Sequence, residues 1–170
     1  MGRSSGGYDG FVSYSHAADG RRAPALQSEV QRLGKPWYRR RALRIFRDTT
    51  GPSASPHLWG SIVVAMDRSE WFVLLCSPEA AASDWVGREI AHWLDTKGPG
   101  RILPVVTGGE WEWDDVGHDF DQGRSNAVPP ALLGAFAAEP RMVDLRWVRS
   151  EDHLNPRDGR FRDAVAEVAA

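Results

Sequence analysis

Short β-prone runs alternate with amphipathic helical segments along this chain of 170 residues, and no other feature limits its fold so strongly. The expected strands are residues 8–14, 43–46, 71–76, 102–106 and 142–145. The expected helices are residues 24–33, 58–69, 84–97 and 161–168, where apolar side chains recur at helical spacing. Strands joined through helices form a parallel sheet covered on both faces. We therefore expect one α/β domain built on a five-stranded parallel sheet.

The run from Trp71 to Cys76 is apolar at every position, which is typical of a central strand in a parallel sheet. Residues 49–56 carry glycine, serine and proline and are expected to form a loop. Residues 108–130 are acidic and rich in glycine and aspartate, which predicts a structured loop rather than a regular element. The acidic and histidine side chains of this segment match the spacing of no standard metal site, so no metal is expected. They are Asp114, Asp115, His118, Asp119 and Asp121.

Charge and cysteine content narrow the class of function. The formal net charge of -2 predicts no general attraction to nucleic acid or to an anionic membrane. Cys76 is the single cysteine, so no internal disulfide forms. The longest apolar runs are far too short to span a bilayer, and residues 1–7 lack the apolar stretch of a signal peptide. These features predict a cytoplasmic domain with residues 1–7 as a flexible leader.

Three sequence boxes occur in a fixed order within this βα pattern: one on the first strand, one on the second, and one that joins the third strand to its helix. They are YDGFVSYSH (residues 8–16), FRD (46–48), and LCSP (75–78) with SDWVGREI (83–90). In the order and spacing of these boxes the chain resembles the Toll/interleukin-1 receptor (TIR) family from about residue 8 to residue 168. The run KPWYRRR at residues 35–41 resembles bacterial, especially actinobacterial, members.

The resemblance implies a flavodoxin-like sheet with strand order 2-1-3-4-5 and helices on both faces. It also implies that residues 8–170 form a TIR domain, which in such bacterial proteins often stands at the N-terminus, ahead of further modules. In a sheet of this order, ligands bind beyond the carboxyl ends of the strands at the point where the order reverses. Residues 13–16 are therefore expected beside Cys76 and Ser77.

Helical spacing places Trp85, Glu89 and Trp93 on one stripe of the expected helix 84–97. From spacing alone, Glu89 is better explained as a solvated residue and Trp85 as a core anchor. The resemblance implies instead that Glu89 is catalytic and that Trp85 lines the pocket of an enzyme acting on NAD. The nicotinamide of NAD is already cationic and leaves as a neutral base, so the barrier lies in the oxocarbenium-like ribose. One positioned carboxylate stabilises that charge.

The resemblance implies NAD as a substrate, with no separate cofactor. An animal TIR enzyme has two arginines after its Ser-Tyr pair, whereas Ser15 and His16 stand there in this chain. Contacts with the phosphates are therefore assigned to His16, Arg47 or Ser77. The loop at residues 49–57 is expected to open and close beside the site. The full set of expected NAD-binding residues is Ser13, Tyr14, Ser15, His16, Arg47, Asp48, Trp59, Ser77 and Trp85.

Three functions are consistent with the sequence and with the family resemblance. The first is an NAD glycohydrolase or ADP-ribosyl cyclase of bacterial immune-type signalling, whose activity depends on self-association. The second is a non-catalytic TIR module that passes a signal by self-association. The third is an enzyme like the nucleoside deoxyribosyltransferases, which share the sheet and a ribose-directed glutamate. The pair Trp85 and Glu89 favours the first over the second, because a pure adaptor does not need it, and the motif order fits a TIR domain better than the third.

Overall fold

The computed structural model describes residues 7–20, 23–24, 45–47, 56–147, 159–160, 163 and 166–167. Its main sheet has five strands in the order β2-β1-β3-β4-β7, and every neighbouring pair is parallel. The strands are β1 (Tyr8–Ser13), β2 (Ile45–Arg47), β3 (Ser69–Cys76), β4 (Ile102–Val106) and β7 (Val143–Asp144). Counted along the chain, this is the expected 2-1-3-4-5 order, so the prediction of a flavodoxin-like α/β fold is confirmed.

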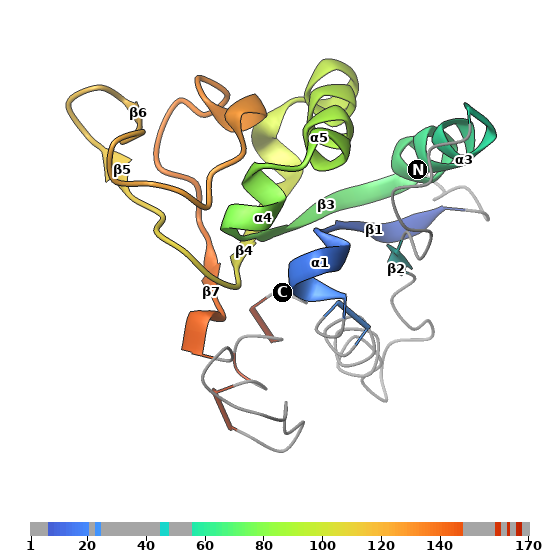
Figure 1. Cartoon of the computed structure of the whole chain (residues 1–170). Helices are drawn as coiled ribbons and strands as arrows, with labels where there is room; N and C mark the ends of the chain where they lie inside the picture. Colours follow the sequence, from blue (N-terminus) through green and yellow to red (C-terminus); the bar gives the residue numbers. More distant parts are fainter. Residues whose placement is uncertain are drawn as a thin grey trace.

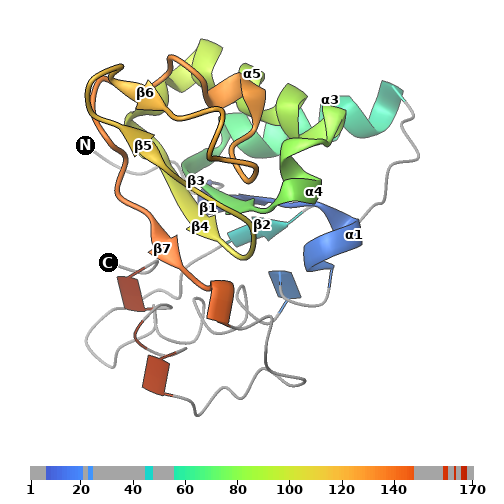
Figure 2. The same ribbon diagram turned by 60° about the vertical axis from the view of Figure 1, so that its left-hand side comes forward.

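Helices cover one face of this sheet in the described part of the chain. They are α3 (Pro56–Asp67), α4 (Pro78–Ala81) and α5 (Asp84–Lys97), and all three lie on the same side in both views (Figure 1, Figure 2). A fourth short helix, α1 (His16–Asp19), follows β1 at its carboxyl end. The expected helices at residues 24–33 and 161–168 lie largely outside the described residues, and the few residues described within them are helical. Among the described helices, none is long and apolar enough to cross a membrane.

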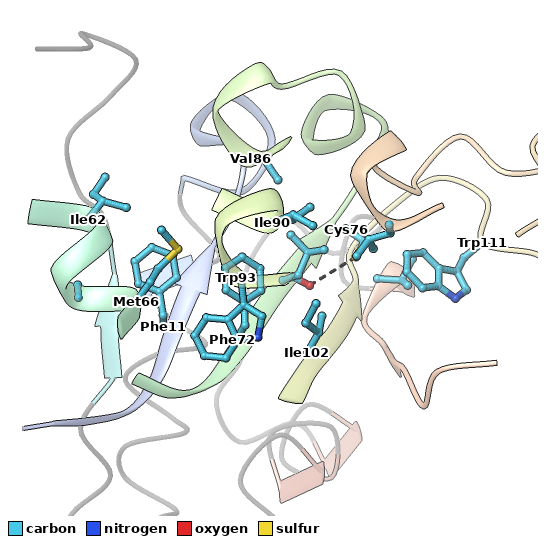
Figure 3. Close-up of a cluster of buried hydrophobic side chains, with 14 of the residues drawn as sticks. Phe11, Ile62, Met66, Phe72, Cys76, Val86, Ile90, Trp93, Ile102 and Trp111 are labelled. Carbon is cyan, nitrogen blue, oxygen red and sulfur yellow. Dashed lines mark hydrogen bonds between the residues drawn. The ribbon is translucent and has the colours of Figure 1, made fainter. Parts of the chain in front are cut away.

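Alternate side chains of β3 turn toward these helices and build the core. Phe72, Leu74 and Cys76 belong to the same buried cluster as Phe11 of β1 and Trp93 of α5 (Figure 3). The rings of Phe11 and Phe72 stack with their centroids 5.7 Å apart, and the Phe72 ring lies 5.2 Å from the Trp93 ring. From Phe72 to Cys76 the apolar run that predicted a central strand is buried on both faces of the sheet, whereas Trp71 at its start is exposed.

Residues 108–130 form the structured loop that their composition predicted, with one regular element that it did not. The strands β5 (Trp113–Asp114) and β6 (Asp119–Phe120) make a small antiparallel pair, and the short 3-10 helix η2 (Pro130–Leu132) follows. The rings of Trp111 and Trp113 meet the Phe120 ring edge to face, at centroid distances of 4.7 and 5.1 Å and interplanar angles of 70° and 85°. Trp111 and Phe120 belong to the main buried cluster, and Trp113 packs against it, so these aromatic contacts join the loop to the core of the domain.

Lys97, the last residue of α5, caps the C-terminal end of helix α3 with its side chain. Lys97 Nζ donates hydrogen bonds to the carbonyl oxygens of Met66 at 2.8 Å and Asp67 at 3.1 Å, and to that of Ser69. The ammonium group also lies 4.4 Å from the centroid of the Trp93 ring. Carbonyls at the end of a helix lack partners within the helix, so this lysine supplies donors that α3 itself cannot.

We expect Lys97→Met to lower the free energy of unfolding by about 1–2 kcal/mol, because the apolar stem is kept while the hydrogen bonds to the carbonyls of α3 are lost. Urea unfolding followed by circular dichroism measures the change. Arg68→Met is the control, since Arg68 is an exposed cation on the turn between α3 and β3 and its loss changes the net charge equally. Equal unfolding midpoints for the two variants would show that Lys97 does not cap α3.

Candidate active site

The helix α5 carries the glutamate of interest, and local sequence signals set its bounds. Ser83 precedes it, and the Ser83 hydroxyl oxygen accepts a hydrogen bond from the Val86 amide at 3.3 Å. Asp84 stands in the first turn and Lys97 in the last, where their charges oppose the partial charges of the helix ends. Gly98 then adopts a φ of 71°, which stops the helix. These signals explain why the helix has the bounds that the sequence predicted.

Glu89 lies on the buried face of α5. The other buried residues of this helix are Val86, Ile90 and Trp93, so the carboxyl group stands in an otherwise apolar row. Only 2% of Glu89 is exposed. Burying a carboxylate is costly unless hydrogen bonds compensate for the lost water. A glutamate at this position therefore has either a structural hydrogen-bond partner or a role in catalysis. The interpretation of Glu89 as a solvated helix residue, which spacing alone favours, is excluded.

Ser13 provides one such hydrogen bond. It is the last residue of β1, it is paired in register with Leu74 of β3, and only 1% of it is exposed. Its hydroxyl donates a hydrogen bond to Glu89 Oε2. Since α5 follows β3 and runs back along the sheet, this contact joins the carboxyl end of β1 to the first half of the helix. Two residues far apart in the sequence thus meet where the strand order reverses.

The other polar residues that follow β1 and β3 come close to this point. Tyr14 and Ser15 are buried, and the Tyr14 ring lies 4.6 Å from the His16 ring. The helix α1, which begins at His16, contacts α4, which begins just after Ser77. Ser77 is fully buried, and its hydroxyl oxygen accepts a hydrogen bond from the Ala80 amide at 3.1 Å, which caps α4. The two segments therefore lie side by side at the carboxyl edge of the sheet.

The two tryptophans among the expected NAD-binding residues meet each other. Trp59 of α3 and Trp85 of α5 have ring centroids 5.4 Å apart, with planes at 82°. Both are partly buried against the core. The Arg88 guanidinium lies 4.2 Å from the Trp59 ring centroid and 5.5 Å from that of Trp85. Trp85 stands one helical turn nearer to the start of α5 than Glu89, so the indole pair lies toward the carboxyl edge of the sheet.

A second buried polar cluster was not found from the sequence. The Thr107 hydroxyl lies 3.1 Å from Asp19 Oδ2 and 3.1 Å from the carbonyl oxygen of Cys76. Asp19 and Thr107 are both buried, and they join α1 to the ends of β3 and β4. In the sequence, Asp19 is only a carboxylate four residues after Ser15, and this spacing does not indicate a contact with Thr107.

Burial raises the pKa of the Cys76 thiol well above its usual range, so this cysteine stays protonated and is a poor nucleophile.

Some expected site residues are only partly covered by the structure. Arg47 pairs through its backbone with Val12 of β1, while its side chain and Asp48 lie outside the described residues.

In the acidic loop, carboxylates accept hydrogen bonds from backbone amides. Asp119 Oδ2 accepts from Gly134 N at 2.9 Å, and Asp121 Oδ1 accepts from Gly123 N at 2.9 Å. These acidic side chains therefore organise the turns of the loop.

A parallel sheet in this order is a flavodoxin-like sheet, and the buried acid lies at the carboxyl edge where the strand order reverses, which is where folds of this class bind ligands. A family model described as the TIR-like domain of the Thoeris protein ThsB matches residues 11–109. The chain belongs to this family of TIR-like domains, which confirms the resemblance inferred from its three sequence boxes.

A curated protein of Actinoplanes sp., named NAD(+) hydrolase ApTIR, is 61% identical to this chain over 163 residues. The match covers 96% of this chain and 23% of that protein, so the chain spans about a quarter of the length of the curated relative. Among solved structures, the TIR domains of the activated Roq1 resistosome directly recognizing the pathogen effector XopQ match with 16% identity and a TM-score of 0.47. That match covers 95% of this chain and 83% of the other.

Proposed function

We propose that this domain cleaves the nicotinamide–ribose bond of NAD, with Glu89 as the catalytic carboxylate and with no other cofactor. The observation that carries the proposal is the burial of Glu89 in an apolar row of α5, at the edge of the sheet where such folds bind ligands. The relative from Actinoplanes sp. is named an NAD(+) hydrolase, and its high identity over nearly all of this chain supports the same activity here.

The reaction follows from the charges involved. When the bond between the ribose and the nicotinamide nitrogen breaks, its electron pair goes to the nicotinamide, which leaves neutral. The ribose is left as an oxocarbenium-like cation, and the Glu89 carboxylate stabilises it in a site from which water is largely excluded. Water then adds to the ribose and loses a proton to solvent, which gives ADP-ribose. Attack by the adenine of the same molecule gives a cyclic isomer instead.

The aromatic pair supplies a surface for the substrate. Trp59 and Trp85 already attract one cation, the Arg88 guanidinium, to their ring faces. The nicotinamide ring of NAD is flat and positively charged, so it is suited to the same kind of contact. We assign Trp59 and Trp85 to the nicotinamide side of the substrate, and His16, Arg47 and Ser77 to its phosphates. Tyr14, Ser15 and Asp48 complete the proposed lining.

The direct test is to incubate the domain with NAD and to measure the nicotinamide released. Release by the wild-type domain and none by a folded Glu89→Ala variant supports the proposal. A domain that binds copies of itself but never releases nicotinamide would instead be a non-catalytic TIR module. The hydrogen bond between Ser13 and Glu89 is the observation that favours this second function, since it gives Glu89 a structural partner.

We propose that this activity depends on self-association of the domain. With Glu89 only 2% exposed, the carboxylate of a single copy is covered, and a substrate reaches it only after neighbouring groups move. Contact with a second copy is a source of the free energy that such a movement needs. We further propose that residues 8–170 act as the N-terminal, cytoplasmic TIR domain of a longer protein in bacterial immune-type signalling, whose other parts bring copies together.

We expect the NAD turnover per copy to rise at least several-fold between a dilute and a concentrated sample, because association supplies the opening of the site. The measurement is the rate of nicotinamide release over a wide range of protein concentrations, with and without a crowding agent. Light scattering on the same samples reports the state of association. A turnover per copy that stays constant while the domain associates would contradict this part of the proposal.

A further inference from the structure

The side chain of Ser13 points into the protein and not toward solvent. Successive side chains of a strand alternate between the two faces, so Ser13 shares a face with Phe11. Phe11 belongs to the core cluster beneath α3 and α5, and Phe72 stacks on it. Ser13 is therefore directed toward the helix layer, where it is 1% exposed. Ser13 thus faces α5, and the polar group that its hydroxyl meets there is the Glu89 carboxylate.

The single proton of the Ser13 hydroxyl takes part in a hydrogen bond within the protein. It is donated to Glu89 Oε2, across 76 positions of the sequence and between two different elements. Such a bond limits rotation of the carboxyl group about its last side-chain torsion, which is otherwise broad for glutamate. Strand β1 is an internal strand of the sheet, paired with β2 on one side and β3 on the other, so the donor itself is held firmly. Rigid support of this kind is what a reacting group needs.

We infer that Ser13 is a positioning residue, which orients the Glu89 carboxylate toward the ribose without touching NAD itself. This inference rests on the proposed function. It replaces the role in substrate binding that sequence resemblance implies for Ser13. Loss of the hydroxyl should then impair the chemical step and leave the binding of NAD unchanged.

The test compares three variants. Ser13→Ala removes the hydroxyl, and Ser13→Thr keeps it on a β-branched side chain that suits a strand. Ser69→Ala is the matched control, because Ser69 is also a buried serine of the sheet. Its hydroxyl donates to the carbonyl oxygen of Ala65 at 2.7 Å, at the opposite, amino edge of β3. Each alanine variant therefore loses one buried hydrogen bond, but only one of them involves Glu89.

For Ser13→Ala we expect kcat for NAD cleavage to fall on the order of 10-fold, with KM within about 2-fold of wild type, since a hydrogen bond to a charged group is lost. Ser13→Thr should restore most of kcat, and Ser69→Ala should keep both constants while unfolding more easily. A Ser13→Ala variant with wild-type kcat would overturn the inference. A raised KM with unchanged kcat would also overturn it, because it would make Ser13 a substrate contact.

A second readout separates this inference from the proposed function. The carbon-13 signal of the Glu89 side-chain carboxyl group, assigned by its absence in Glu89→Gln, should move in Ser13→Ala and stay in place in Ser69→Ala. An unmoved signal in Ser13→Ala would overturn the inference whatever the activity. If the signal moves but the wild-type domain releases no nicotinamide, the contact is real and the proposed function is the part that fails.

Discussion

Replacing Glu89 with glutamine is expected to lower the rate of NAD cleavage by about 10²–10³-fold or more, the usual loss when the main charge stabiliser of a transition state is removed. Glutamine has nearly the same shape and keeps an oxygen that accepts the hydrogen bond from Ser13. Because it lacks the negative charge, it cannot stabilise the developing oxocarbenium ion. Initial rates of nicotinamide release by the two proteins, at equal concentration, measure the effect.

The control for this variant is Asp95→Asn on the same helix. Asp95 is exposed on the outer face of α5, so the substitution makes the same change in charge and hydrogen-bonding groups without entering the core. Its activity is expected to match that of wild type. Thermal unfolding of all three proteins shows whether Glu89→Gln remains folded. If a folded Glu89→Gln variant kept more than about a tenth of the wild-type rate, the assigned role of Glu89 would be wrong.

Trp93→Ala is expected to lower the free energy of unfolding by about 3–5 kcal/mol, the usual cost of emptying a buried tryptophan site. Trp93 is fully buried, packs against Phe72, and carries the Lys97 ammonium over its ring. Domains of this size have a total stability of about 5–15 kcal/mol, so this loss leaves a small margin. Urea unfolding followed by far-ultraviolet circular dichroism measures it.

Trp71→Ala provides the comparison for Trp93→Ala. Trp71 lies on β3 but is 43% exposed, and the Arg101 guanidinium lies 5.6 Å from its ring centroid. The same chemical truncation there should cost clearly less, because little buried volume is emptied. Similar losses at the two positions would mean that Trp93 is not part of a packed core. Trp93 would then be, like Trp85, a candidate for a residue that faces the ligand.

The fold was predictable from the sequence because its main elements have apolar patterns and capping residues that indicate them without knowledge of the tertiary structure. The run from Trp71 to Cys76 is apolar throughout, and helix α5 has both a serine cap before it and Gly98 after it. The elements that were missed are too short for periodicity to detect. β5 and β6 have two residues each and depend on contacts among aromatic side chains. α4 has four residues and depends on the Ser77 cap.

The site was only partly predictable. Spacing put Trp85, Glu89 and Trp93 on one stripe, but it did not reveal that Trp93 is fully buried while Trp85 is only partly so. The contact between Ser13 and Glu89 joins two elements, and nothing in the sequence of either one indicates it. The same holds for Thr107 and Asp19, which are 88 positions apart. Such contacts depend on the order and register of the strands, which local sequence patterns do not specify.

The proposed function depends on one reaction, the cleavage of the nicotinamide–ribose bond of NAD by this domain. The most direct measurement follows NAD, nicotinamide and the ADP-ribosyl product together by chromatography, with the wild-type domain at high concentration and under crowding. We expect one nicotinamide to appear for each NAD consumed, and we expect a folded Glu89→Gln sample under the same conditions to release less by about 10²–10³-fold or more. NAD that stays intact with the concentrated, associated wild-type domain would show that the domain does not cleave NAD.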